Sequence, residues 1–576
     1  MTIADLWYGT SGPKDAEIVL VGEAWGSEEQ SHQLPFVGSS GTELDRILAE
    51  AGIRRNDILV TNTVAARPHM NNMWEFFFPK DEEDPAHCIR GLYPTELVRN
   101  ELGRLEQQIM AHPRKLVIAC GNYALWALSN CTRPTTARKE TGFRRTPTGI
   151  GNWRGSMWYT HGLNNIKLLP IYHPAAIMRA WDTRAVTVHD LKSRVPMALL
   201  GQWRPQPEPV FLAPPTYQQC ISKLDHWLRR AQDESFVLAA DVETVRQEFI
   251  SCFGFADSVH FAMSIPFLRP TGPKTYESYW TPLQEANIVL RIRKLLTHPS
   301  VRFVGQNFLY DIQYCIEWFD VTPHVDFDTM LAQNVIFPGT PKDLGYLSSL
   351  YCKYHWYWKD DHKDWNSVDD LPSLLSYNCL DNIRTYEVAE SQRNMIAHLG
   401  MDKQMHDMMR IAGLCLRMMK RGVRFDRSRA LHLAVELAEA RAKVHEKLER
   451  MVPQSVVGES KSGVRWYTSD RQTATLFYDI LGFPVVKDRK TGNPTVSKEA
   501  LNILPKKMPI WKPMFEALKL ERSLENSYNV ISSKIDRDGR MRCYFSPSTE
   551  TMRLSSSKNA FGRGMNLMNL TKGKED

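Results

Sequence analysis

The stretch Phe236–Glu243, FVLAADVE, joins an uninterrupted apolar run to two acidic residues. A short apolar run of this kind predicts a buried strand. Side chains two positions apart on a strand share one face, so Asp241 and Glu243 are expected to point into one site. Downstream, Ser251–Phe255 and His260–Ile265 predict antiparallel neighbours of this strand. The stretch therefore predicts a sheet that carries an acidic site.

Two further acidic residues follow similar elements. Val301–Val304 predicts another strand, and Asn307 and Asp311 follow it with the spacing N-x3-D. Tyr377 and Asp381 stand four apart in a helical pattern and so share one helical face. Four carboxylates in one pocket repel each other unless hard divalent cations neutralise them. Two such ions about 4 Å apart can activate a water and stabilise the leaving oxygen of a phosphodiester.

The ordered set D-x-E, N-x3-D and Y-x3-D resembles the three exonuclease motifs of the DEDD superfamily, in its tyrosine-bearing branch. The resemblance covers about residues 210–395, and Asp328–Leu331 resembles the region between the second and third motifs. It implies that Tyr377 positions the attacking water and that Asn307 contacts DNA. It also implies two Mg²⁺ or Mn²⁺ ions and their ligands: Asp241, Glu243, Asp311 and Asp381.

The sequence beyond residue 401 resembles the front part of A-family DNA polymerases. Met418–Asp426 is similar to the helix-turn that follows the exonuclease, and Thr468–Leu504 is similar to the thumb. Gly539–Ser556 is similar to the strand that leads into the palm. The substrate implied is therefore DNA, with a single-stranded 3′ end or a primer-template, rather than the RNA of RNase D-like enzymes.

Three residues near the end match the polymerase motifs that touch the duplex, and this implies DNA contacts for Arg553, Asn566 and Asn569. Residues 537–576 hold eight Lys and Arg against four Asp and Glu, an excess that suits phosphates. By itself the excess is equally typical of a solvated basic tail. Met552 stands where the family usually has glycine. The palm aspartates and the fingers helix do not follow, so we expect no polymerisation from this chain alone. We expect either an excised piece or one half of a split polymerase, with palm and fingers on a second chain.

Short apolar runs also mark the N-terminal part. Ala16–Val21, Lys115–Ala119 and Lys167–Ile171 are separated by helical stretches, a pattern typical of a parallel α/β sheet. Gly22–Gly26 and Pro35–Gly41 follow the first of these runs. Two more motifs come later in the chain: Thr61–Pro68 and His173–Arg179.

In this order the four motifs resemble the uracil-DNA glycosylase superfamily, closest to its iron–sulfur type, over about residues 15–195. Such enzymes flip a base into a pocket and read its edge. The resemblance implies that Phe36 stacks on the base and Asn62 reads it. It also implies that Glu23 handles the water and that His173 stabilises the departing base.

Two departures concern this glycosylase-like part. Trp25 replaces the motif proline and could fill the pocket. An iron–sulfur cluster needs four cysteine ligands, but only Cys88, Cys120 and Cys131 precede residue 205, and Ala66 stands at one expected ligand position. We therefore expect no iron–sulfur cluster. Retained glycosylase activity and a fold reused for DNA binding or assembly are equally open.

The predicted fold class is a multidomain α/β protein with three parts. We expect a glycosylase-like three-layer α/β/α domain over residues 1–205 and an RNase H-like mixed-sheet exonuclease domain over residues 206–400. Residues 401–576 are expected to form a mainly helical thumb with the beginning of a palm. Trp203–Thr216 holds five prolines and predicts an extended linker. Met405–Val452 predicts helices broken at Arg421–Val423.

Composition excludes several other classes of protein. Ten cysteines occur without a C-x-x-C pair, which argues against a disulfide framework or a zinc ribbon. The sequence has no membrane-length apolar run and no secretory signal at its start. These features predict a cytoplasmic protein (host cytoplasm for a virus) that needs no membrane. The net charge of +7 is compatible with a polyanionic partner.

The main hypothesis is a proofreading 3′→5′ exonuclease of a DNA polymerase involved in replication, as in a phage-type fusion. One alternative is a uracil-DNA glycosylase with an appended exonuclease. The other is a non-catalytic DNA-binding subunit of a replication complex.

Overall fold

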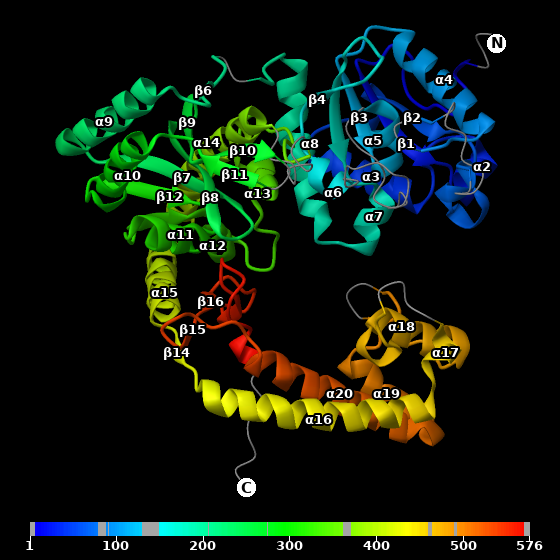
Figure 1. The fold of residues 1–576 in the computed structure, drawn as a ribbon. Coiled ribbons are helices and arrows are strands. Elements are labelled where there is room, and N and C mark those ends of the chain that lie inside the picture. Colours follow the sequence, from blue (N-terminus) through cyan, green and yellow to red (C-terminus); the bar gives the residue numbers. More distant parts are fainter. Residues whose placement is uncertain are drawn as a thin grey trace. The chain divides into compact units, whose positions relative to one another are not determined.

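The computed structural model describes residues 6–78, 88–89, 92–129, 149–204, 207–272, 275–360, 370–458, 463–488 and 492–569. The chain divides into two compact units, residues 1–409 and residues 410–576 (Figure 1). Within the described ranges, no helix combines the length and apolarity that crossing a bilayer requires.

The first sheet of unit 1 has five strands in the order β2-β1-β3-β5-β4. Strands β1, β2, β3 and β5 run parallel, as predicted, and the short β4 joins β5 antiparallel at the edge. Strands β2 and β3 are buried throughout because helices cover both faces of the sheet. The bounds are β1 Ile18–Ala24, β2 Leu59–Val64, β3 Leu116–Cys120, β4 Trp158–Tyr159 and β5 Lys167–Ile171.

Two cores form on the two faces of this sheet, because successive strand residues face opposite ways. Leu20 and Ile118 pack under α3, α7 and α8, whereas Val19 and Val117 pack under α4 and α5. This is the expected three-layer α/β/α arrangement. The helices are α2 Ser27–His32, α3 Ser39–Glu50, α4 Glu96–Met110, α5 Asn122–Leu128, α6 Ile150–Trp153, α7 Pro174–Arg179 and α8 Thr183–Leu199.

The second sheet of unit 1 is mixed, with the order β13-β12-β7-β8-β9-β6. Strands β7, β8 and β9 are antiparallel neighbours, as predicted, and β12 runs parallel to β7. The linker expected over Trp203–Thr216 is wrong for Val210–Leu212, which pairs with β9 as the edge strand. The prolines flank these three residues, and an edge strand tolerates them there. The bounds are β6 Val210–Leu212, β7 Phe236–Val245, β8 Phe249–Ser258, β9 Phe261–Pro266, β12 Val301–Gly305 and β13 Val325–Asp328.

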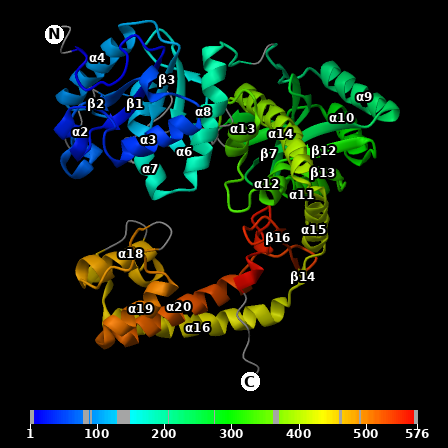
Figure 2. The same ribbon diagram turned by 180° about the vertical axis from the view of Figure 1, so that it is seen from behind.

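Helix α14 packs on strands β7, β8 and β9 of this sheet, and Figure 2 shows its full length from behind. The close approach depends on Gly254 of β8. A Cβ atom there would lie 2.1 Å from Asn378 Oδ1 and 2.2 Å from Asn382 Nδ2. The other elements of this part are α9 Tyr217–Asp233, β10 Leu268–Gly272, β11 Thr275–Ser278, α10 Pro282–Thr297, α11 Leu309–Phe319, α12 Thr329–Ile336, α13 Leu344–Tyr351 and α14 Leu371–Leu399.

Helices dominate the second unit, where α16 packs along α20 over an apolar core. The predicted break is present: α15 ends at Arg421, and Gly422 has a φ of +62° that favours glycine. The multidomain α/β fold class is thus confirmed. The elements are α15 Asp402–Arg421, β14 Val423–Arg424, α16 Arg427–Met451, α17 Gln454–Val457, α18 Asp470–Ala474, α19 Lys498–Lys507, α20 Lys512–Ile531, β15 Arg540–Met541, β16 Cys543–Ser546 and β17 Ser555–Lys558.

Candidate functional site

Strand β7 carries the first two acidic residues of the predicted site. The strand runs on to Val245, so Asp241 and Glu243 lie within it rather than after its end. Across β8, Asp241 pairs with Gly254. Because the two acids are two positions apart, both carboxylates reach the same face of the sheet.

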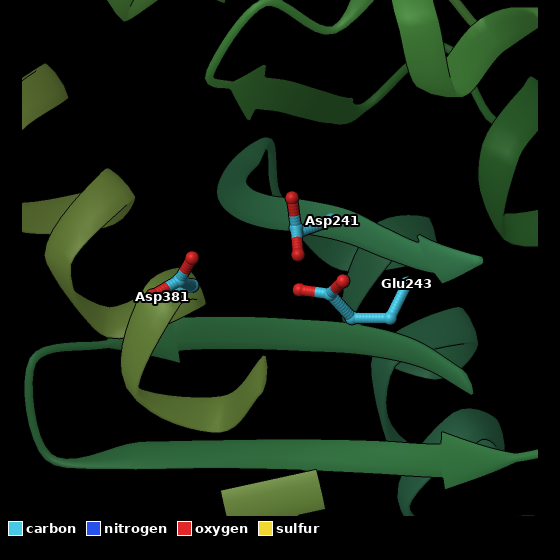
Figure 3. Close-up of side chains that lie close together, drawn as sticks. All are labelled: Asp241, Glu243 and Asp381. Atoms are coloured by element: carbon cyan, nitrogen blue, oxygen red, sulfur yellow. The ribbon is translucent and has the colours of Figure 1, made fainter. Parts of the chain in front are cut away.

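Helix α14 supplies the third carboxylate, Asp381. One oxygen each of Asp241, Glu243 and Asp381 lies within 4.8 Å of the other two, and Figure 3 shows the three carboxylates facing one another. We call these three residues the acidic trio. They are brought together by the packing of α14 on β7, from segments far apart in the chain.

Asp311 lies beside the acidic trio rather than within it. It is buried on α11, and its Oδ1 accepts a hydrogen bond from the backbone N–H of Val242 at 2.9 Å. That N–H stands between Asp241 and Glu243 on β7. The structure therefore places all four predicted metal ligands in one region, with Asp311 tied to the backbone that carries two of them.

Burial and mutual repulsion raise the pKa values of these acids. Burial, followed by the charge of Asp381, raises the pKa of Asp241 to about 7. Burial and then Asp241 raise the pKa of both Glu243 and Asp311 above the usual range. Ionised carboxylates this close together repel one another, and a bound cation removes that repulsion. Mg²⁺ and Mn²⁺ prefer oxygen ligands. The donor set therefore fits the predicted metal ions.

Two neighbouring side chains that the sequence analysis missed hold Asp381 of the acidic trio in place. Trp358 Nε1 donates to Asp381 Oδ1 at 2.5 Å. Lys359 Nζ donates to Tyr377 OH at 3.1 Å and to Asp381 Oδ2 at 3.3 Å. The only sequence signal was the aromatic run Trp356–Trp358 directly before a lysine.

These surroundings also set the charges next to the acidic trio. Burial lowers the pKa of Lys359, but the charges of Asp381 and Glu243 outweigh it, and the net shift is upward. Burial, then the charge of Asp381, raises the pKa of Tyr377 well above its usual value. At neutral pH the lysine is therefore cationic and the phenol is protonated.

Asn378 is a further contact of the site that was not predicted. Its Nδ2 donates to Asp241 Oδ2 at 2.8 Å, and its Oδ1 accepts from Ser264 Oγ at 2.7 Å. The amide is therefore oriented by β9 and in turn orients Asp241. Its place between Tyr377 and Asp381 in the third motif was the available signal.

Asn307, predicted to contact DNA, occupies the turn between β12 and α11 with a φ of +56°. Its backbone N–H donates to Asp328 Oδ1 at 3.3 Å, and the N–H of Phe308 donates to Asp328 Oδ2 at 2.8 Å. Asp328 also caps α12 by accepting from Met330 N–H at 2.9 Å. Asp328 therefore fixes the turn that leads to Asp311.

The residues predicted for a base pocket lie around the ends of β1, β2 and β5. The rings of Phe36 and His173 have centroids 5.4 Å apart. A Cβ atom on Gly22 would lie 2.2 Å from Asn62 Oδ1 and 2.6 Å from Phe36 Cε2, so glycine leaves room between them. The structure thus brings Phe36, Asn62 and His173 together. Glu23 points to the start of α5 and accepts from the N–H of Tyr123 at 3.2 Å.

Protonation states in this pocket follow from burial. Burial, then the charge of Arg179, lowers the pKa of His173 to about 4, so the imidazole is neutral at pH 7. Its Nδ1 accepts from Ala175 N–H at 3.2 Å, which leaves the hydrogen on Nε2. Burial also raises the pKa of Glu23. Asn62 is 1% exposed, and its Nδ2 has no hydrogen-bond partner among the described residues. A buried amide donor of this kind suits a carbonyl on a ligand.

Trp25, which was expected to be able to fill the pocket, packs elsewhere. Its ring lies tilted beside that of Tyr8, with centroids 5.4 Å apart, and close to the backbone of Gly9. Among the described residues, no ring contact or hydrogen bond joins Trp25 to Phe36 or His173.

The surroundings of Ala66 do not fit an iron–sulfur cluster. Ala66 packs against an apolar cluster that includes Phe76, Phe77 and Trp126. Cys120 is buried elsewhere, with its Sγ 3.7 Å from Tyr172 O. The remaining two cysteines are Cys88, which is partly exposed, and Cys131, which lies outside the described residues.

The three predicted DNA contacts of the second unit lie around the β16–β17 hairpin. Arg553 is exposed in the connecting loop, and its backbone oxygen accepts from Thr549 Oγ1 at 2.6 Å. Asn566 Oδ1 accepts from Met568 N–H at 3.0 Å, which caps the short turn that ends at Asn569. None of the described hydrogen bonds joins Arg553 to Asn566.

Comparisons with known proteins identify the N-terminal part. The family model described as the uracil DNA glycosylase superfamily matches residues 10–192. A type-4 uracil-DNA glycosylase of Thermotoga maritima is 43% identical over 183 residues, which make up 31% of this chain and 77% of that protein. A type-4 uracil-DNA glycosylase of Archaeoglobus fulgidus is 29% identical over 182 residues, 31% of this chain and 76% of that protein.

A comparison with solved structures gives a weaker likeness. The POL domain of Pol1 from M. smegmatis, in complex with DNA primer-template and dNTP, aligns with a TM-score of 0.41 and 18% identity. The alignment covers 61% of this chain and 55% of that chain. At this score the likeness carries no argument about fold or activity. The glycosylases, in contrast, are matched over most of their own length. Through residues 10–192, the chain therefore belongs to the uracil-DNA glycosylase superfamily.

Proposed function

We propose that the second sheet and its helices form a divalent-metal-dependent 3′→5′ exonuclease that trims DNA ends and serves proofreading during replication. The observation that supports it is the acidic trio of Asp241, Glu243 and Asp381, whose oxygens lie within 4.8 Å of one another. Four carboxylates gathered at one place are costly to the fold, and metal-assisted phosphodiester hydrolysis gives them a use. The polymerase resemblance of residues 401–576 favours DNA as the substrate.

The chain's own residues would act as follows. The acidic trio and Asp311 would hold the cations, which when bound supply an activated water and neutralise charge on the phosphate. Lys359 donates to the oxygen of Tyr377 and so fixes the hydroxyl that we assign to the attacking water. Asn378 keeps the Asp241 carboxylate turned into the site.

The exonuclease is tested with a 5′-labelled single-stranded DNA in Mg²⁺. Replacing Asp241 and Glu243 together with alanine should lower the rate of 3′ shortening by about 1,000-fold or more, because the ions lose most of their ligands. Glu248→Ala removes an exposed carboxylate beyond the end of β7 and should keep the wild-type rate. Undiminished degradation by the double variant would refute the assignment.

A second activity, excision of uracil from DNA, is favoured by the pocket of Phe36, Asn62 and His173 and by the relatives in the glycosylase superfamily. We propose that Phe36 stacks on the base, that the Asn62 amide reads its edge, and that neutral His173 donates through Nε2 to the departing base.

This activity is measured in EDTA, which chelates divalent ions and so inhibits a metal-dependent nuclease. Uracil-containing DNA is incubated with the chain, and alkali then breaks the strand at abasic sites. We expect breaks at uracil that fall about 100-fold or more in His173→Ala and persist in His161→Ala, which changes an exposed histidine. An absence of breaks with the wild-type chain would leave the pocket as a DNA-binding or assembly surface. If the chain also fails to shorten DNA but binds primer-template, it is a non-catalytic DNA-binding subunit.

A further inference from the structure

The segment Cys352–Asp360 directly follows α13, and we call it the bridging segment. It has no regular secondary structure, so its side-chain and backbone contacts determine where it lies. It makes contacts in two directions. One set reaches the glycosylase-like part of unit 1, and the other reaches the acidic trio.

Two of the contacts with the glycosylase-like part bracket the middle of the bridging segment. Trp153 Nε1 donates to Asp360 Oδ2 at 2.7 Å, and Ser156 Oγ accepts from the N–H of Tyr357 at 3.1 Å. Trp153 is 1% exposed, and the ring of Tyr357 belongs to the same apolar core as Trp153. These contacts therefore lie in the buried interior of the glycosylase-like part and not on its surface.

Further contacts anchor the start of the bridging segment to the same domain. Arg194 of α8 donates to the backbone oxygens of Cys352 at 3.1 Å and Lys353 at 2.5 Å. The N–H of Met157 donates to His355 O at 2.9 Å. The backbone of the segment is thus satisfied largely by groups from the first domain.

The two residues between these anchors face the other way. Trp358 and Lys359 lie between Tyr357 and Asp360 in the chain, and both donate hydrogen bonds to Asp381. Lys359 also holds the hydroxyl of Tyr377. Consecutive Cα atoms are only about 3.8 Å apart, so a shift of either anchor must move the side chains that hold Asp381.

We infer that the glycosylase-like domain positions the exonuclease site, with Trp153 and Ser156 acting as positioning residues through the bridging segment. The inference rests on the proposed exonuclease function. Outer partners that orient metal ligands typically change metal affinity or activity by about 10–100-fold when removed. Trp153 acts one layer further out, so we expect about a 3–10-fold effect.

The first test compares two tryptophan variants in the full chain. Trp153→Phe keeps a ring in the core but removes the donor to Asp360. Trp126→Phe removes a matched buried donor of the same domain, which bonds Ile89 O at 3.2 Å. Mn²⁺ titration followed by electron paramagnetic resonance should show about 3–10-fold weaker binding in Trp153→Phe and wild-type binding in Trp126→Phe. In exonuclease assays, kcat should fall in Trp153→Phe by a similar factor, with KM for DNA unchanged.

A second pair of variants separates positioning from simple loss of stability. Asp360→Ala removes the acceptor for Trp153, whereas Asp360→Asn keeps an acceptor oxygen and should recover most of the Mn²⁺ affinity. All measurements are made at a temperature where thermal unfolding shows each variant folded. If Trp153→Phe and Asp360→Ala bind Mn²⁺ and hydrolyse DNA like the wild type, the positioning role is wrong. If instead the wild type binds Mn²⁺ but does not shorten DNA, the exonuclease assignment fails, and the titrations alone decide the positioning role.

Discussion

At the scale of single residues, Met552 has a backbone conformation that side chains usually avoid, with a φ of +57°. The polymerase resemblance puts glycine at this position, and a left-handed conformation costs other residues about 1 kcal/mol. Met552→Gly should therefore raise the free energy of unfolding of the second unit by up to about 1 kcal/mol in urea denaturation. Met418→Gly, at similar exposure inside α15, should lower it by about 1 kcal/mol. A loss in Met552→Gly would mean that the methionine side chain holds the loop.

The indole of Trp358 gives a second prediction at this scale. Its N–H orients Asp381, so Trp358→Phe should weaken Mn²⁺ binding by about tenfold or more. Trp227→Phe is the matched control, because Trp227 Nε1 makes the same kind of bond to Asp257 Oδ2, at 2.7 Å, away from the acidic trio. Calorimetric titration of both variants measures the difference. Equal affinities would show that Asp381 needs no orientation by Trp358.

Sequence reasoning succeeded for residues whose spacing reveals a shared face and failed for those without periodic neighbours. Asp241 and Glu243 are two positions apart on a strand and so share one face. Tyr377 and Asp381 lie one helical turn apart. Local geometry therefore predicts that the side chains of each pair lie close together. Lys359 lies in an irregular segment where no period links it to Asp381. Only the folded chain places its ammonium group there.

At the scale of elements, the contact between α14 and β8 determines whether the acidic trio forms. Gly254→Ala would push α14, which carries Asp381, away from β7, because the added Cβ meets the amides of Asn378 and Asn382. We expect a loss of about 1–3 kcal/mol in stability and at least about a 100-fold loss of exonuclease rate.

Gly103→Ala is the control for this prediction. Gly103 lies in α4 with nothing near its missing side chain, so alanine should add up to about 1 kcal/mol and leave the rate unchanged. Urea denaturation and exonuclease rates are measured for both variants and compared with the wild type. A fully active Gly254→Ala enzyme would mean that α14 can shift without opening the acidic trio.

Strands with apolar runs could be predicted, and their neighbours in the central sheets could be inferred from the α/β pattern. The strand β6 could not, because five prolines around Val210–Leu212 gave the signal of a linker. Its pairing with β9 comes from contacts distant in sequence. The two edge strands β4 and β6 show the same limit: short edge strands carry little periodic signal of their own.

At the scale of the whole molecule, the motifs predicted the multidomain α/β class. They did not predict the buried contacts between the glycosylase-like and exonuclease-like parts. Arg154 and Asp190 form a fully buried ion pair, with Arg154 Nη2 and Asp190 Oδ1 2.5 Å apart, and Arg154 also donates to Ser349 Oγ at 2.8 Å. Such a pair in a sequence is indistinguishable from two surface charges. Both charges belong to the glycosylase-like part, and the second part supplies Ser349 Oγ as a further acceptor for the buried guanidinium. The glycosylase-like and exonuclease-like parts are therefore expected to unfold together.

This shared interior makes unit 1 sensitive to acid through His355. Burial, then the charges of Arg194 and Arg384, lowers the pKa of His355 well below its usual value. The unfolded chain takes up a proton near pH 6.5 and the folded chain does not, so stability is complete above that pH and is lost as the pH falls. Between pH 7.5 and 5, the wild type should lose about 2 kcal/mol more than His355→Asn, measured by hydrogen exchange of β7 amides. His432→Asn, which changes an exposed histidine of α16, should behave like the wild type. Equal acid losses in wild type and His355→Asn would mean that His355 takes up its proton as readily in the folded chain as in the unfolded chain.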